Sequence, residues 1–215
     1  MFNRATYKQN ALSTLKNNWG TACLLSIILL VLSGLSSTGA GIVCVCVAGI
    51  ICVGIITTFM RMIAAANSFN ADSSEEQKPV SFNTFLQALE DHWLNALLGS
   101  LWNFLWVFLW SLLFVIPGIV KSYSYSMMFY VMAENKKIGP QKAMDISKIL
   151  TQGHKADLFM LDLSFLGWMI LCGFSCGIGF IWLLPYMTMT ETYAYYDLKR
   201  MAFAQNKLTP ADFEA

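Results

Sequence analysis

The chain has 215 residues, of which 56 % are hydrophobic and 13 % are charged. Soluble domains usually carry about 25 % charged residues, so the composition argues against a soluble domain and predicts a polytopic membrane protein. The net charge of +1 argues against binding to nucleic acid, which requires a basic patch.

Six apolar runs follow one another along the chain, and we expect each to cross the membrane. They lie at 20–35, 42–62, 94–116, 118–133, 157–174 and 178–197. A straight crossing takes about 20 residues, so the first and fourth runs are short for a span. Turns that contain Gly, Pro or Ser join the runs into three helical hairpins. The predicted fold is all-α, a six-span transmembrane bundle forming one integral membrane domain over residues 1–215.

An amphipathic segment precedes each hairpin. Its apolar positions, spaced for one helix face, are Leu12, Leu15 and Trp19, then Leu86, Leu89 and Trp93, and more loosely Ile146, Ile149 and Gly153. We expect a cytoplasmic interfacial helix before each hairpin. The matches suggest internal repeats at 1–66, 81–134 and 139–200, although helices before spans also look alike by chance.

The basic residues predict the orientation. Of the 14 Lys and Arg residues, all except Lys121 lie before, between or after the hairpins. Basic loops stay cytoplasmic, so we expect both termini in the cytoplasm. After Lys207, the residues Thr209, Pro210 and Asp212 predict the start of a short final helix.

The sequence contains no familiar catalytic motif. It has no HExxH, GxSxG, Walker A or paired CxxC motif. The six cysteines lie in or at the ends of apolar runs with no His nearby, which is typical of small packing residues. We therefore predict a protein that is not an enzyme and that has no cofactor and no metal.

Polar residues inside the apolar runs are the candidate functional residues, because a charge at mid-membrane costs about 2.5–3.5 kcal/mol. The candidate intramembrane site is Lys121, Asp162, Glu191, Asn103 and Tyr125. We expect the two acids at matched heights on adjacent helices and Lys121 nearer the outer leaflet. Two interpretations stay open: a transport site, or a snorkelling lysine and acids that hydrogen-bond between helices.

Residues with aromatic and imidazole rings predict the membrane boundary. His154 and Lys155 form a candidate interfacial motif at the inner end of the fifth run. Tyr193, Tyr195 and Tyr196 resemble an inner aromatic belt.

Three motifs resemble a known family. They are the run 116–126 (IPGIVKSYSYS), the segments 147–155 and 161–168, and Pro185-Tyr186 followed by Thr190 and Tyr195-Tyr196. Together they resemble the bacterial integral membrane family called domain of unknown function 975, common in Gram-positive bacteria, over essentially the whole chain. Glu134-Asn135 departs conservatively from the polar pair expected there. The resemblance implies a six-span protein of the bacterial plasma membrane without an established activity.

The chain is also loosely similar to the membrane domain of some glycerophosphodiester phosphodiesterases, which implies an accessory role. The first hypothesis is a non-enzymatic accessory protein whose partners are the lipid bilayer and a membrane protein. The alternative is a small transporter or channel that uses Asp162, Glu191 and Lys121.

Overall fold

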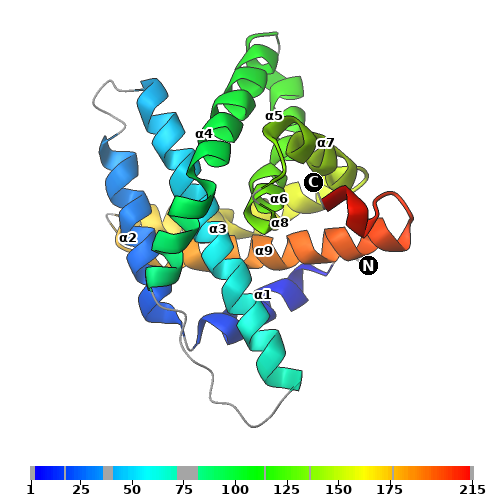
Figure 1. Ribbon diagram of the computed structural model, residues 1–215. Coiled ribbons are helices and arrows are strands. Elements are labelled where there is room, and N and C mark those ends of the chain that lie inside the picture. The colour runs from blue at the N-terminus through cyan, green and yellow to red at the C-terminus, as the bar shows by residue number, and fades with distance from the viewer. Residues whose placement is uncertain are drawn as a thin grey trace.

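A computed structural model describes residues 3–16, 18–35, 41–71, 82–113, 115–135, 137–175 and 177–213. In these ranges the chain is helical, and the predicted all-α class is confirmed (Figure 1). The helices are α1 (Arg4–Leu15), α2 (Trp19–Leu35), α3 (Gly41–Ala71), α4 (Phe82–Leu113), α5 (Val115–Tyr125), α6 (Met128–Glu134), α7 (Pro140–Thr151), α8 (Lys155–Phe174), α9 (Phe180–Ala204) and the 3-10 turn η2 (Pro210–Phe213).

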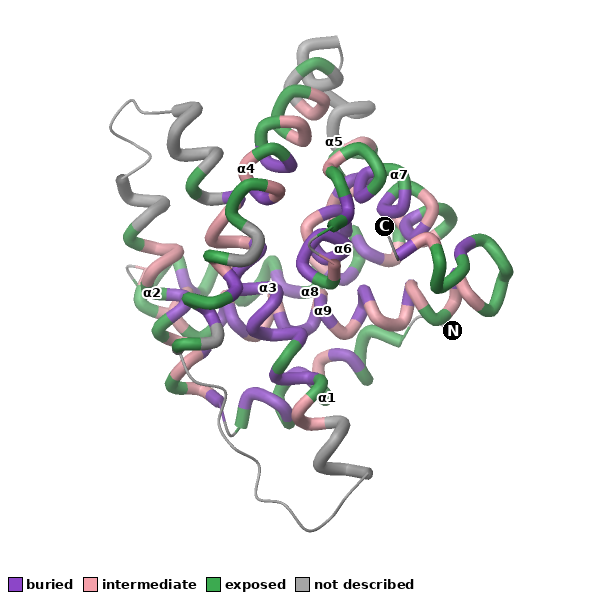
Figure 2. Tube along the Cα trace, viewed as in Figure 1, coloured by how far each residue is buried: buried purple, intermediate pink, exposed green. Residues whose placement is uncertain are grey.

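The helix α9 forms the centre of the fold. It runs across the molecule in contact with α1, α2, α3, α7 and α8 (Figure 1). Met189 packs with residues of α1, α2 and α3, whereas Tyr195 and Leu198 pack with residues of α6, α7 and α8. Figure 2 shows buried residues gathered where α3, α6 and α9 meet. The last long helix therefore joins two apolar clusters into one core.

Small residues bring α3 and α4 into close contact. A Cβ added at Gly49 would collide with the side chain of Ser100, and one at Gly54 would lie 2.8 Å from a methyl carbon of Leu89. Small residues at helix interfaces let the backbones approach closely, which is the usual packing device in membrane proteins.

The fourth apolar run is not one continuous helix. α5 ends at Tyr125, and α6 begins at Met128. The buried hydroxyl of Ser147, on α7, donates a 2.8 Å hydrogen bond to the carbonyl oxygen of Ser124, close to this break. A carbonyl near a helix end needs such a partner, so α7 satisfies the backbone where the run is interrupted.

The predicted amphipathic segments take two forms. The first and third are the separate helices α1 and α7, and Gly153, with φ of +90°, lies in the turn that ends α7. The middle segment is instead the beginning of the 32-residue helix α4. The range 82–113 contains no proline, so nothing in its sequence separates the amphipathic part from the apolar part.

In the described residues, two helices are long and apolar enough to cross a membrane by themselves. They contain Gly49–Ala66 and Lys155–Phe174, and a third candidate is the pair Arg4–Leu15 and Trp19–Val31, bent by 105°. α5 and α6 are each short, and α9 carries the charges of Glu191 and Asp197. The six-span arrangement and the three repeats therefore stay predictions.

The predicted final helix is confirmed as η2. The carboxylate of Asp212 accepts hydrogen bonds from the backbone N–H of Thr209 at 2.7 Å and from its hydroxyl at 2.9 Å. These bonds, the backbone one first, lower the pKa of Asp212. The capping pattern Thr209-Pro210-Ala211-Asp212 thus forms as the sequence predicts.

Candidate functional site

The five residues of the predicted intramembrane site lie in different surroundings. Lys121 and Tyr125, one turn apart on α5, line a cavity against α4 and α7. Asp162 and Glu191 each accept a hydrogen bond from a tyrosine. The fifth residue, Asn103, has its side-chain oxygen buried, and within the described part of the chain this oxygen accepts no hydrogen bond.

The carboxylate of Asp162 ties α8 to α5. The hydroxyl of Tyr123 donates to Asp162 Oδ2 at 2.8 Å. The ring of Tyr123 packs edge-on against Phe159, with the ring centroids 5.9 Å apart. This is the interhelical hydrogen bond that the structural interpretation of the acids predicts.

Glu191 belongs to a reciprocal pair of contacts between α6 and α9. The Tyr130 hydroxyl donates to Glu191 Oε2 at 2.8 Å, and the Tyr195 hydroxyl donates to Glu134 Oε2 at 2.6 Å. The two tyrosine rings stack with their centroids 5.5 Å apart. Lys199 completes the group with an ion pair to Glu134.

The sequence carries a signal for this reciprocal pair. Tyr130 precedes Glu134 by four residues, and Glu191 precedes Tyr195 by four residues, in the opposite order. Residues four apart lie on one helix face, so the two faces match when the helices run in the same direction, Tyr130 beside Glu191 and Glu134 beside Tyr195. Tyr195 is fully buried, so its assignment to an interfacial belt is wrong: its hydroxyl has a partner inside the protein.

α1 is attached to α9 by two further polar contacts. The hydroxyl of Tyr7 donates to the carboxylate of Asp197, and the hydroxyls of Thr14 and Tyr193 lie 2.6 Å apart. Burial, followed by the hydrogen bond to Asp197, raises the pKa of Tyr7. The polar residues of α9 thus reach α6 with Glu191 and Tyr195, and reach α1 with Tyr193 and Asp197.

The predicted interfacial motif lies at the start of α8. His154 is the N-cap residue, and Lys155 is the first residue of the helix. His154 Nδ1 lies 3.0 Å from Asp157 Oδ2, within the first turn. A carboxylate in the first turn is stabilised by the positive end of the helix dipole, so the pair supports the helix start.

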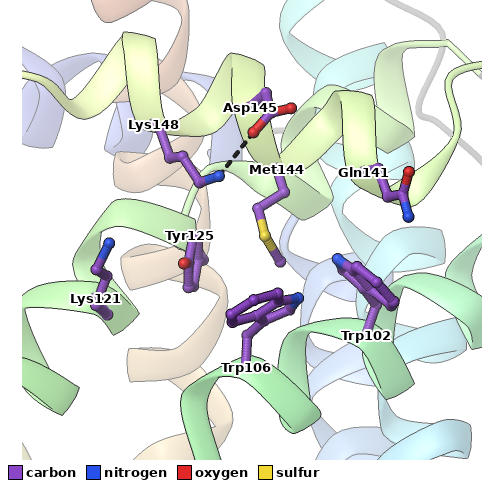
Figure 3. Close-up of a pocket in the computed structure, with 8 residues that line it drawn as sticks. All are labelled: Trp102, Trp106, Lys121, Tyr125, Gln141, Met144, Asp145 and Lys148. Atoms are coloured by element: carbon purple, nitrogen blue, oxygen red, sulfur yellow. Dashed lines mark hydrogen bonds and ion pairs between the residues drawn. The ribbon is translucent and has the colours of Figure 1, made fainter. Parts of the chain in front are cut away.

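The cavity around Lys121 lies between α4, α5 and α7 and has a volume of about 340 Å³. Figure 3 shows Lys121, Lys148 and Tyr125 at one end and Trp102 and Trp106 at the other. The remaining lining side chains, all on α7, are Gln141, Met144 and Asp145.

The neighbours of Lys121 were not predicted from the sequence. Its expected place nearer the outer leaflet stays a prediction. α5 ends at Tyr125 and packs against α7, so Lys121 shares a cavity with Lys148. The α7 residues of this cavity were not recognised from the sequence, although Lys148 was counted among the inner basic residues.

A second, larger hollow is apolar. It has a volume of about 540 Å³ and lies between the amphipathic helix α1, the first residue of α2, the end of α8 and the start of α9. Its aromatic lining residues are Trp19, Trp168, Trp182 and Tyr186.

The described cysteines Cys23, Cys52 and Cys172 are free thiols. Among the described residues, no three His, Cys, Asp or Glu side chains come together as metal ligands do.

Comparison with known proteins gives one family. Residues 104–202 match the model of the family described as "Protein of unknown function (DUF975)". No curated protein and no solved structure matches the chain. The looser similarity to a phosphodiesterase membrane domain is not shown. The matched region contains both acids, both reciprocal tyrosines and Lys121, and it begins one residue after Asn103. Residues 104–202 are therefore similar to the DUF975 family, which supports the resemblance that the motifs predict.

Proposed function

We propose that the protein is a non-enzymatic accessory protein of the bacterial plasma membrane. It crosses the bilayer several times, keeps both termini in the cytoplasm, and acts through its embedded and inner-face helices on lipid or on a membrane-protein partner. The observation that carries this proposal is the exposed apolar surface of α8.

α8 combines the length of a span with an apolar surface that the protein leaves uncovered. Its 20 residues have a mean hydropathy of 1.6, yet only 22 % of them are buried. The large exposed apolar side chains are Phe159, Met160, Leu163, Leu166, Trp168, Ile170, Leu171 and Phe174. A continuous apolar surface of this kind on a helix of about 30 Å supports contact with lipid or with a partner helix.

A second apolar face on α4 supports the same conclusion. Its exposed leucines recur at intervals of three or four residues, at Leu94, Leu98, Leu101, Leu105 and Leu109. This spacing puts them on one side of the helix. α3 covers the opposite side, where Gly49 and Ser100 meet.

The hydrogen bonds of the acids support a non-enzymatic role. Asp162 and Glu191 each accept a hydrogen bond from a tyrosine on another helix. Buried polar groups in membrane proteins are commonly satisfied by such interhelical bonds. The two acids therefore have a structural use in holding α8 and α9 to α5 and α6.

Membrane extraction and cysteine labelling test the proposal. We expect the protein to stay in the membrane pellet after an alkaline carbonate wash. In a background without native cysteines, an impermeant maleimide should label Ser175→Cys, in the α8–α9 turn, on intact cells. Gln205→Cys, just after α9, should react only after permeabilisation. Release by carbonate would overturn membrane integration, and labelling of Gln205→Cys on intact cells would overturn the orientation.

The alternative is a transporter or channel that uses Asp162, Glu191 and Lys121. It has less support, because Lys121 lines its own cavity whereas the acids pair with tyrosines. Asp162→Asn and Glu191→Gln variants test it. Loss of a solute flux from proteoliposomes, with the fold retained by circular dichroism, would favour the alternative over the accessory role.

A further inference from the structure

The cavity between α4, α5 and α7 is chemically polarised. Lys121, Lys148 and Tyr125 lie at one end, and the indoles of Trp102 and Trp106 form the other end (Figure 3). The ring of Tyr125 and the side chain of Met144, both 3 % exposed, form part of its wall. A ligand that fits this lining has an anionic group at one end and an apolar body at the other.

The charges of the lining favour a single negative group. Lys121 and Lys148 contribute two positive charges, and Asp145 contributes one negative charge. Asp145 Oδ1 lies 2.7 Å from Lys148 Nζ, which in turn lies 5.8 Å from the centroid of the Tyr125 ring. Asp145 thus neutralises part of the positive charge while holding Lys148 at the cavity. The net charge of the lining is +1, which matches one phosphodiester.

The residue types also fit a lipid headgroup. A lysine ammonium is a compact charge that binds phosphate without fixed geometry. Tryptophan rings favour the level of the headgroups, because one edge is polar and the rest is apolar. The cavity provides both kinds of residue, lysines for the phosphate and tryptophans for the headgroup level. The tryptophans are on α4, whose exposed face is apolar.

We propose that this cavity binds the phosphate of an anionic phospholipid from the inner leaflet, with the glycerol and upper acyl chains against Trp102 and Trp106. The leaflet is inferred from α7, which carries Lys148 and belongs to the inner-face helices. This inference rests on the proposed membrane location. The inference adds to the proposed function the class of lipid that is bound and the residues that bind it.

Lipid binding by charge variants tests the site. The purified full-length protein, in neutral detergent, is titrated with phosphatidylglycerol, with phosphatidylcholine and with inorganic phosphate, and binding is followed by native mass spectrometry. Lys121→Gln with Lys148→Gln should weaken phosphatidylglycerol binding by about 30-fold, since each lysine near a headgroup contributes about fivefold. Lys142→Gln is the matched control: it removes an exposed lysine of α7 outside the cavity and should change binding less than about twofold.

The comparison of the two lipids with inorganic phosphate distinguishes binding of a lipid headgroup from binding of free phosphate. The proposal expects phosphatidylglycerol to bind more tightly than phosphatidylcholine and expects millimolar phosphate not to displace it. Equal binding of the two lipids, or displacement by phosphate, would overturn lipid recognition. Equal losses in the Lys142→Gln and cavity variants would overturn the site. Lys121→Arg with Lys148→Arg should retain binding, which distinguishes lost charge from misfolding.

The carbonate wash keeps this proposal separate from the proposed function. A protein released from the membrane contradicts the proposed function whatever lipid it binds. A protein that stays in the membrane but does not prefer phosphatidylglycerol contradicts only the lipid site.

Discussion

Removal of the Tyr130 hydroxyl by Tyr130→Phe is expected to destabilise the contact between α6 and α9. The substitution keeps the ring that stacks on Tyr195 and removes the donor that lies 2.8 Å from Glu191 Oε2. Tyr130 is 4 % exposed, so water has little access to replace the lost donor. A buried acceptor deprived of its partner costs about 1–3 kcal/mol.

Tyr195→Phe is the matched comparison. It removes the equivalent hydroxyl on the other helix, but Glu134 keeps its ion pair with Lys199. We therefore expect a smaller loss, about 0.5–1.5 kcal/mol, the usual net value of one hydrogen bond. The order of the two effects, Tyr130→Phe above Tyr195→Phe, follows from which carboxylate keeps a second partner.

A double-mutant cycle isolates the bond itself. Unfolding in mixed micelles would be measured for Tyr130→Phe, Glu191→Leu and the double variant, because leucine removes the acceptor that glutamine would keep. Coupled residues give interaction energies of about 0.5–3 kcal/mol, although interhelical bonds in membranes average near 0.6. A coupling energy near zero would refute the hydrogen bond as a stabilising contact. A larger loss for Tyr195→Phe than for Tyr130→Phe would refute the reasoning about the second partner.

Three further predictions concern packing, the helix break and the final turn. Gly49→Leu should lower the stability by about 1–3 kcal/mol through overpacking, whereas Gly167→Ala, with open space around it, should be neutral or slightly stabilising in the same unfolding assay. Ser147→Ala should cost about 0.5–1.5 kcal/mol and increase amide exchange at the end of α5, because it removes the shorter of two side-chain hydrogen bonds to the carbonyl of Ser124, the other being the 3.5 Å bond from the Thr151 hydroxyl; unchanged exchange would contradict this role. The hydrogen bonds from Thr209 lower the pKa of Asp212, so the η2 cap should be fully formed above the ordinary aspartate pKa of about 3.9 and be lost as the pH falls through the lowered value. Amide exchange of Thr209 against pH measures this, and protection that rises on acidification would contradict it.

The all-α class and several helices follow from local patterns in the sequence. Apolar runs mark α2, α3 and α8, and the Thr209–Asp212 cap marks η2. The break between α5 and α6 was not predictable in the same way, because Ser126 and Met127 are not residues that end helices. The break is accompanied by a hydrogen bond from α7, which is a tertiary contact.

The candidate site likewise contains residues that the sequence predicts and contacts that it does not. The cost of burying a charge identifies Asp162 and Glu191 from the sequence alone. Their partners, Tyr123 and Tyr130, are defined by which helices pack together. The cavity that Lys121 lines depends on α7 packing beside α5, so no local pattern reveals it.

The order of residues in the tyrosine–carboxylate pairs has a consequence for synthesis. Tyr7, Tyr123 and Tyr130 all come earlier in the chain than their acids, Asp197, Asp162 and Glu191. In a protein inserted as it is made, each of these acids therefore emerges after its donor has been made.

The fourth pair is reversed, since Glu134 comes before Tyr195. Glu134 is also the acid whose side chain remains 30 % exposed in the finished fold. Its exposure allows hydration until α9 is made, whereas the donors of the half-buried acids precede them in the chain. For a membrane-embedded protein, as we propose, this chain order shortens the time that a carboxylate spends in the membrane before its donor is available.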